Sequence, residues 1–374
     1  MSEPIPLARP VIGRREEELV LEALRSGRLS LGPLLERFER DFADRLGVAE
    51  AVAVSSGTAA LHLGVRALGW GRGDEVLTSP FSFVASANCL LYEGARPVFC
   101  DVDPVTLDLD PAAAKAAIGP RTAGILPVDI FGMPAALPEL SRIAAGAGLG
   151  MLEDACEALG AVDSEGREVG TREWPATFAF YANKQMTTGE GGMLASSDPG
   201  VAARARSERN QGRGRDMGWL EHAGLGYNYR LSELACALGI AQLERLDEML
   251  AIRERVAGLY ESRLSSVEGV ETPPGRHGAA RRSWFVYVVS LPEGADRDAV
   301  IADLAARGVA SKAYLPCMHL FPHLRELGYR EGDFPIAEAA SARSLALPFH
   351  PGIGETEVER VATALSDALG RGAP

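Results

Sequence analysis

Lysine is the residue type whose rarity in this sequence is most informative. The chain has 38 basic residues, and all of them are arginines except Lys115, Lys184 and Lys312. Arginine stays protonated in proteins and forms no imine, whereas a lysine amine can attack a carbonyl carbon. Lys184 follows the apolar run ATFAFYAN and precedes a turn rich in threonine and glycine. Partial burial there favours the neutral, nucleophilic amine; the competing interpretation is a surface lysine at a strand end.

Two further segments place polar groups where a strand ends. In VAVSSGTAALHL, a strand is expected to end at residues 55–56 and a helix to begin near residues 57–58. Small residues at that turn let backbone N–H groups approach an anion, although a plain N-cap explains the pattern equally well. In MLEDACEALGA, the strand ends at Asp154. This carboxylate could hold a protonated pyridine nitrogen, or it could be a turn residue.

Several other kinds of chemistry are not indicated. The glycines of GAGLG follow a helix and precede a strand, which is the reverse of a dinucleotide-binding turn. The sequence contains no HExxH, GxxxxGK[ST] or GxSxG motif, and its six histidines lack metal-ligand spacing, so no metal is expected. His319 and His323 flank an aromatic turn, where they could line a cleft or be structural.

The elements that would carry these residues alternate between strand and helix. Apolar runs at 51–56, 74–79, 96–102, 124–132, 150–155, 177–182 and 191–197 are typical of buried strands, with helical patterns between them. This alternation predicts an α/β fold with a mostly parallel sheet that binds ligands at the carboxyl ends of its strands. One long helix over 232–264 is expected to lead to a smaller α+β unit. We therefore predict two domains, 1–249 and 250–374.

Composition narrows the function classes. The net charge of -13 argues against a nucleic-acid groove or an anionic membrane surface as partner. Five scattered cysteines without a CxxC pair indicate reduced thiols, and the first residues lack a secretory signal. No apolar run approaches the roughly 20 residues of a membrane span. We expect a cytoplasmic protein.

The sequence strongly resembles the DegT/DnrJ/EryC1/StrS family of sugar-nucleotide aminotransferases. The similarity extends over nearly the whole chain and includes SSGTAALHL, EDACEALGA, NKQMTTGEGGM, RNQGRG and GYNYRLSELACALGIAQLERLD. It implies the pyridoxal-phosphate (PLP) transferase fold of type I and transfer of an amino group, expected to come from L-glutamate, to a keto group of a nucleoside-diphosphate sugar. It also implies a homodimer with composite active sites.

The resemblance also assigns roles to individual positions. It makes Lys184 the catalytic lysine, bonded to PLP and carrying protons. It implies cofactor contacts at seven positions: Gly57, Thr58 and Ala59 at the phosphate, Phe83 stacked on the ring, Asp154 at the pyridine nitrogen, Glu157 at the phenolic oxygen, and Asn228 at the phosphate of the neighbouring subunit. His319 falls in the loop that faces the sugar nucleotide. The pyrophosphate could meet Arg213 and Arg215, or Arg281 and Arg282.

Two positions depart from the family pattern. Ala179 stands where many members have a phosphate-binding serine, so Ser56 or Asn183 would have to compensate. Glu157 replaces the usual glutamine, so its carboxyl must be protonated or turned aside, or it raises the basicity of the phenolic oxygen. Three alternatives also follow: a sugar dehydratase, which Lys184 disfavours because that branch has histidine there; an enzyme for a non-sugar ketone such as an amino-cyclitol precursor; and a non-catalytic relic of the fold.

Overall fold

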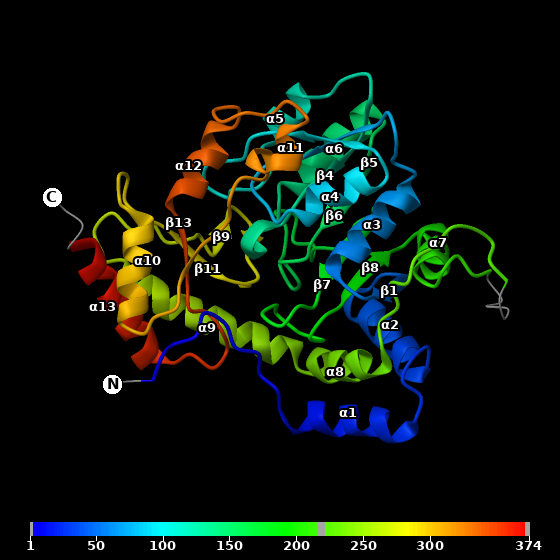
Figure 1. Ribbon diagram of the computed structural model, residues 1–374, viewed down its shortest axis with the longest axis horizontal. Helices are drawn as coiled ribbons and strands as arrows, with labels where there is room; N and C mark the ends of the chain where they lie inside the picture. Colours follow the sequence, from blue (N-terminus) through cyan, green and yellow to red (C-terminus); the bar gives the residue numbers. More distant parts are fainter. Residues whose placement is uncertain (1–2, 215–220, 371–374) are drawn as a thin grey trace.

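The computed structural model describes residues 3–214 and 221–370 of the chain. A larger α/β unit contains a central sheet, and a smaller unit lies beside it (Figure 1). The strands of the larger unit are β1 (Glu50–Val54), β2 (Glu75–Thr78), β3 (Arg96–Phe99), β4 (Thr122–Leu126), β5 (Gly150–Met151), β6 (Glu153–Asp154), β7 (Ala176–Ala179) and β8 (Gly192–Ser196).

The strands form two four-stranded ladders that meet at one segment of the chain. Their orders are β3-β2-β4-β5 and β6-β7-β8-β1, and only Leu152 separates β5 from β6. β2 is parallel to β3 and β4, β4 to β5, and β6 to β7. Only β8 runs antiparallel to its neighbours, β1 and β7. The prediction of a mostly parallel sheet is confirmed, and β8 is its exception.

Helices cover both faces of this sheet, as its continuously apolar strands require. In β1, Val52 and Val54 join the hydrophobic cluster of α3, whereas Ala51 and Ala53 join the cluster of Phe38 on the opposite face. The helices of the larger unit are α1 (Arg14–Ser26), α2 (Pro33–Leu46), α3 (Gly57–Leu68), α4 (Ala85–Tyr92), α5 (Pro111–Ala116), α6 (Leu137–Ala147) and α7 (Pro199–Arg209), with a 3-10 turn η1 (Ile130–Gly132).

The expected bridging helix is two helices. α8 (Glu233–Glu244) and α9 (Leu246–Leu264) are separated at Arg245, whose φ of -120° and ψ of 15° are not helical. Leu246 still belongs to the core of the larger unit, whereas Val256 and Leu264 belong to that of the smaller unit. The break therefore lies where the chain passes from one core to the other.

The smaller unit is built on an antiparallel sheet with strand order β11-β13-β12. The N-terminal segment of the chain also joins this unit, because Ile5 pairs with Val309 and is buried in this core. The domain boundary at residue 249 stays a prediction. The remaining elements are β9 (Arg276–His277), β10 (Ala280–Arg281), β11 (Tyr287–Ser290), α10 (Arg297–Ala306), β12 (Lys312–Ala313), η2 (Met318–Leu320), α11 (Pro322–Arg325), α12 (Pro335–Arg343), β13 (Ser344–Leu347) and α13 (Glu355–Gly370).

Within residues 3–214 and 221–370, no helix is both long and apolar enough to cross a bilayer.

Candidate active site

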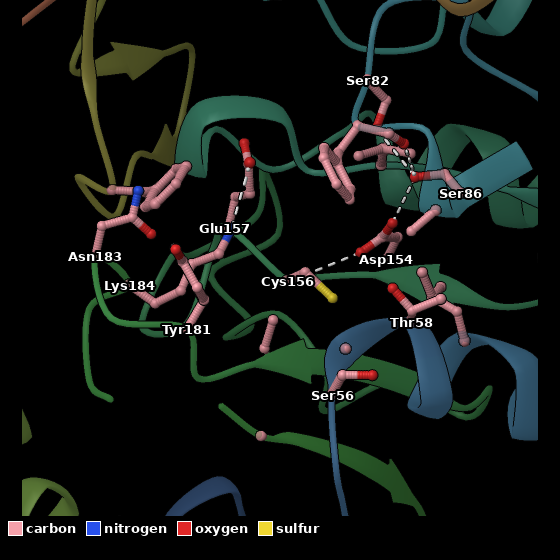
Figure 2. A pocket seen from close by; sticks show the side chains of 18 of the residues that line it. Ser56, Thr58, Ser82, Ser86, Asp154, Cys156, Glu157, Tyr181, Asn183 and Lys184 are labelled. Carbon is pink, nitrogen blue, oxygen red and sulfur yellow. Dashed lines mark hydrogen bonds and ion pairs between the residues drawn. The ribbon is translucent and has the colours of Figure 1, made fainter. Parts of the chain in front are cut away.

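A cavity of about 510 Å³ lies at the carboxyl ends of the strands of the larger unit. The start of α3, the loop before α4 with the first residues of α4, the end of β6 with the residues after it, and the turn between β7 and β8 form most of it (Figure 2). Val128 after β4 and two residues of the smaller unit complete it. It is lined by Ser56, Gly57, Thr58, Leu61, Ser82, Phe83, Ala85, Ser86, Val128, Asp154, Cys156, Glu157, Ala179, Tyr181, Asn183, Lys184, Glu190, Gly191, Phe285 and Tyr314. The position agrees with the sheet-edge site predicted from the sequence.

Lys184 reaches this cavity from the turn between β7 and β8. Its Nζ lies 3.4 Å from Oε1 of Glu157 and 3.8 Å from the centroid of the Phe285 ring. Only 12% of the side chain is exposed. Lys115 in α5 and Lys312 in β12 are both exposed and do not line the cavity. Among the three lysines, the structure therefore brings Lys184 alone to the sheet-edge site.

Asp154 is held rigidly at the end of β6. Its Oδ2 accepts a hydrogen bond of 2.7 Å from the Ser86 hydroxyl, and its Oδ1 accepts one of 3.2 Å from the Cys156 amide. The carboxylate is 5% exposed and faces the cavity (Figure 2). Burial, followed by the charge of Asp154, raises the pKa of the Cys156 thiol well above its usual value. Asp154 therefore presents a negative charge that a cationic ligand group can meet.

The start of α3 satisfies both interpretations of its sequence. Ser56 is the N-cap, because its hydroxyl accepts a hydrogen bond of 3.1 Å from the Ala59 amide, and it also lines the cavity. Gly57 and Thr58 line the cavity as well, whereas Ala59 is buried behind them. A Cβ on Gly57 would lie 2.7 Å from the Cβ of Ala179. Glycine is thus required for the helix to begin so close to β7.

The two carboxylate oxygens of Glu157 contact different partners. Its Oε2 accepts a hydrogen bond of 2.9 Å from the Phe131 amide, and its Oε1 faces Lys184. Burial, with a further contribution from the Glu157 charge, raises the pKa of the nearby Tyr314 phenol. The arrangement gives the carboxylate a cationic neighbour and one fixed hydrogen bond.

The two candidates for replacing the missing serine at Ala179 differ in their contacts. The Ser56 hydroxyl is engaged as the N-cap of α3. Oδ1 of Asn183 is buried and has no hydrogen-bond partner among residues 3–214 and 221–370. Oδ1 is a hydrogen-bond acceptor, so it could meet a donor group of a ligand but not a phosphate oxygen.

Three other predicted site residues, Asn228, His319 and Arg213, do not line the cavity. Asn228 is exposed and pairs with Asn210 on the connection between α7 and α8. His319 is fully buried with Nε2 3.0 Å from Oε1 of Glu338, and burial lowers the pKa of its imidazole. Arg213 also lies outside the cavity lining.

The second arginine pair is divided between surface and interior. Arg281 is exposed in β10, and Arg282 is buried, donating to the Pro274 and Phe131 carbonyls at 2.9 and 2.8 Å. Arg215 falls outside the described residues. Neither Arg281 nor Arg282 lines the cavity.

Sequence reasoning missed several residues that line the site. Ser86 follows the predicted aromatic position Phe83 by three residues, and a search for hydroxyls on the helix after β2 would have found it. Phe285 and Tyr314 lie more than a hundred residues after Lys184, and no spacing rule connects them to it. Among the described residues, no group of three or more histidine, cysteine, aspartate or glutamate side chains is arranged to hold a metal ion.

Known proteins are similar to this chain in both sequence and architecture. Residues 10–366 match the model of the DegT/DnrJ/EryC1/StrS aminotransferase family. GDP-perosamine synthase of Caulobacter vibrioides is 40% identical over 368 residues, 98% of each chain. The aminotransferase TlmJ from Streptoalloteichus hindustanus is 34% identical with a TM-score of 0.91, covering 98% of this chain and 99% of its own. A 3-amino-5-hydroxybenzoic acid synthase is 33% identical with a TM-score of 0.92, covering 99% and 100%. The chain belongs to the DegT/DnrJ/EryC1/StrS aminotransferase family.

Proposed function

We propose that this aminotransferase moves an amino group from L-glutamate to a keto group of a nucleoside-diphosphate sugar, with Lys184 as its catalytic lysine. The observation that carries the proposal is the meeting of three groups at one cavity: the Lys184 amine, the Asp154 carboxylate and the start of α3. An amine, an anion and a helix N-terminus are the partners that the carbonyl, ring nitrogen and phosphate of PLP require.

The cavity fits PLP on grounds of shape and donor chemistry. Its volume of about 510 Å³ lies within the range of small-molecule sites. Gly57 and Gly192 leave no Cβ where β7, β8 and the start of α3 approach one another, so backbone amides remain accessible to an anion. The unpartnered Oδ1 of Asn183 is an acceptor with no partner among the described residues, so it could meet a donor group of a bound ligand. Gly57 and Thr58 would hold the phosphate, Asp154 the ring nitrogen and Phe83 the ring face.

The chemistry divides between cofactor and protein. When bound, PLP supplies an electron-accepting ring that stabilises the carbanion left when a proton leaves the carbon bearing nitrogen. Lys184 Nζ is the group that accepts that proton and later returns one, acting as general base and then as general acid. Ser86 and the Cys156 amide hold the Asp154 carboxylate in place, so it would keep the ring nitrogen of bound PLP protonated through a charge-assisted hydrogen bond.

The Glu157 carboxylate lies beside the Lys184 amine and is held there by the main chain. Its Oε1 lies 3.4 Å from Nζ, within ion-pair distance. Its other oxygen is fixed by the Phe131 amide, so the carboxylate cannot swing freely away from the cavity. Glu157 therefore keeps a fixed position beside Nζ.

The nucleotide and sugar are suggested by the relatives. A GDP-linked amino sugar appears in the name of the relative that is 40% identical over 98% of the chain. We therefore take GDP-linked keto sugars as the first substrates to test. A non-sugar ketone is the second candidate, because a 3-amino-5-hydroxybenzoic acid synthase has a similar structure at 33% identity.

One experiment separates these candidates. The protein loaded with PLP is incubated with L-glutamate and a panel of GDP-, UDP- and dTDP-linked keto sugars and cyclic ketones, and 2-oxoglutarate release is measured. Release that depends on a nucleotide keto sugar and is absent in Lys184→Ala supports the proposal. Release with cyclic ketones alone favours the second candidate, and no release with any acceptor, in a protein that stays colourless with PLP, favours a non-catalytic relic.

A further inference from the structure

A buried arginine connects the turn of Lys184 to the smaller unit. Arg253 lies on α9, the helix that runs from the larger unit to the smaller one (Figure 1). It is 4% exposed and does not line the cavity. No sequence motif points to Arg253.

The two ends of its guanidinium bind two different segments. Nη2 donates to the main-chain carbonyls of Lys184 at 2.9 Å and Asn183 at 3.3 Å. Nη1 donates to the carbonyls of Phe285 at 3.1 Å and Trp284 at 3.5 Å. A planar guanidinium fixes the angle between its two N–H groups, so it also fixes the distance between the two segments.

No acidic side chain among residues 3–214 and 221–370 forms an ion pair with Arg253. Burial alone lowers the pKa of the guanidinium to about 10. Placing a charged group in the interior without an opposite charge is unfavourable unless hydrogen bonds replace its lost water. The carbonyls of two segments provide those bonds to Nη1 and Nη2, whereas Nε is buried without a hydrogen-bond partner among the described residues. An apolar residue could fill this space without desolvating a charge, so packing alone does not account for an arginine here.

Phe285 shows what the connection achieves at the site. The carbonyl of Phe285 binds Nη1, and its ring lies 3.8 Å from Lys184 Nζ on the cavity side. An ammonium at that distance from a ring face is attracted by the ring's quadrupole. The same arginine therefore holds the main chain of the lysine and the main chain of the residue that contacts its amine.

A second set of contacts prevents the Phe285 segment from moving as a whole. Ser283 N donates to Gly132 O at 2.8 Å, and Gly132 has a φ of 85°. A Cβ at Gly132 would lie 1.7 Å from the Ser283 carbonyl oxygen, so only glycine permits this approach. With that side anchored, the Arg253 bonds set where the Lys184 turn lies relative to the Phe285 ring.

We propose that Arg253 is a positioning residue for Lys184, which holds the lysine turn against the Phe285 segment so that Nζ lies between the Phe285 ring and Glu157. This inference rests on the proposed catalytic role of Lys184. A lysine at position 253 could bind one carbonyl pair but could not span both, because an ammonium is a compact point charge. Arg253→Lys should keep the buried charge and lose the link.

The test uses cofactor-free protein, so that it does not depend on any substrate. The chain has three lysines, and peptide mapping after brief treatment with acetic anhydride reports the acetylation rate of each one. Lys115 and Lys312 are exposed and serve as internal standards. In Arg253→Lys, we expect Lys184 to be acetylated about three to ten times faster relative to Lys115, because its amine is no longer held against the ring and carboxylate.

Arg297→Lys is the matched control. Arg297 also donates to main-chain carbonyls, those of Ser341 and Ser344, but within the smaller unit. It should lower the melting temperature without changing the Lys184 to Lys115 ratio. In PLP-loaded protein, Arg253→Lys should reduce kcat on the order of 10- to 100-fold while KM for both substrates changes much less, since Arg253 touches neither.

Two results would overturn the inference. One is a wild-type acetylation ratio in folded Arg253→Lys, which would leave the arginine a purely structural role. If Arg253→Lys does not fold, Phe285→Leu replaces it, because leucine keeps an apolar side chain and removes the ring. The second result that would overturn the inference is an unchanged acetylation ratio in Phe285→Leu. A changed acetylation ratio together with no transamination of any acceptor would count against the proposed function and leave the positioning role intact.

Discussion

At the scale of the residue, the identity of the reactive lysine is the most direct prediction. Lys184→Ala should abolish transamination and leave the fold intact, because its side chain faces the cavity, where Glu157 and Phe285 flank its amine. Borohydride reduction of the PLP-loaded wild type should attach the cofactor covalently to one peptide. Mass spectrometry should find it on Lys184; an adduct on Lys115 or Lys312 would show that the assignment is wrong.

Asp154 permits a second test at this scale. Asp154→Asn preserves the size of the side chain and a hydrogen bond to Ser86 but removes the charge that keeps a ring nitrogen protonated. We expect PLP to bind and kcat to fall on the order of 100-fold or more. Ser86→Ala, which disturbs only the orientation of the carboxylate, should cost less. Turnover near wild type in Asp154→Asn would make Asp154 a turn residue only.

Glu157→Gln tests the departure from the family pattern. A carboxylate near a protonated nitrogen raises the pKa of that nitrogen, so its removal should lower it. The pH midpoint of the visible absorbance of the PLP-loaded protein should therefore be lower in Glu157→Gln than in wild type. An unchanged midpoint would mean that Glu157 carries no charge at the site or faces away from the bound cofactor.

At the scale of the element, β8 approaches the start of α3 closely, where we propose that the phosphate binds. A Cβ on Gly192 would lie 2.5 Å from the carbonyl carbon of Ser56 and 2.7 Å from the amide nitrogen of Gly57. Because these are backbone atoms, Gly192→Ala must shift the helix start. We expect a loss of about 1–3 kcal/mol in the free energy of unfolding and weaker PLP binding, measured by denaturation and by spectral titration.

The control for this prediction is a glycine with free space around it. Gly146 lies in α6, and an added Cβ would meet nothing within 4 Å. Gly146→Ala should raise stability by up to about 1 kcal/mol, because alanine favours helix, and leave PLP binding unchanged. Equal PLP affinity in Gly192→Ala and wild type would show that the helix start does not form the anion site.

Some features of the elements could be predicted from the sequence, and others could not. Apolar runs and strand-end residues predicted the sheet, its parallel character and the meeting of Lys184, Asp154 and Gly57 at one edge, because these features depend on local pattern. The antiparallel direction of β8 and the helix break at Arg245 depend on which core each segment joins. The contacts of Lys184 with Glu157 and Phe285 join residues 27 and 101 positions away, and no local pattern specifies such pairs.

At the scale of the whole molecule, large apolar side chains are exposed at and near the cavity. Phe83 and Tyr181 line it with 60% and 52% exposure, and Leu225 near Asn228 is 71% exposed. Large apolar side chains in such positions are typical of protein interfaces. Asn228 itself is exposed and does not line the cavity of its own chain. These observations support the proposal that a second copy of the chain covers this face and that Asn228 contributes to the partner's site.

A symmetric dimer with shared sites predicts complementation between two defective chains. Lys184→Ala and Asn228→Ala should each be poor catalysts alone, the first without its amine and the second through weak PLP retention. In a mixed dimer, one site carries both changes and the other carries neither, because each site combines Lys184 from one chain with Asn228 from the other. Co-refolding the two variants should therefore give activity approaching half that of wild type per mixed dimer. With subunit exchange verified by differently tagged chains, a mixture that shows only the sum of its parents would mean that Asn228 acts within its own chain or not at all.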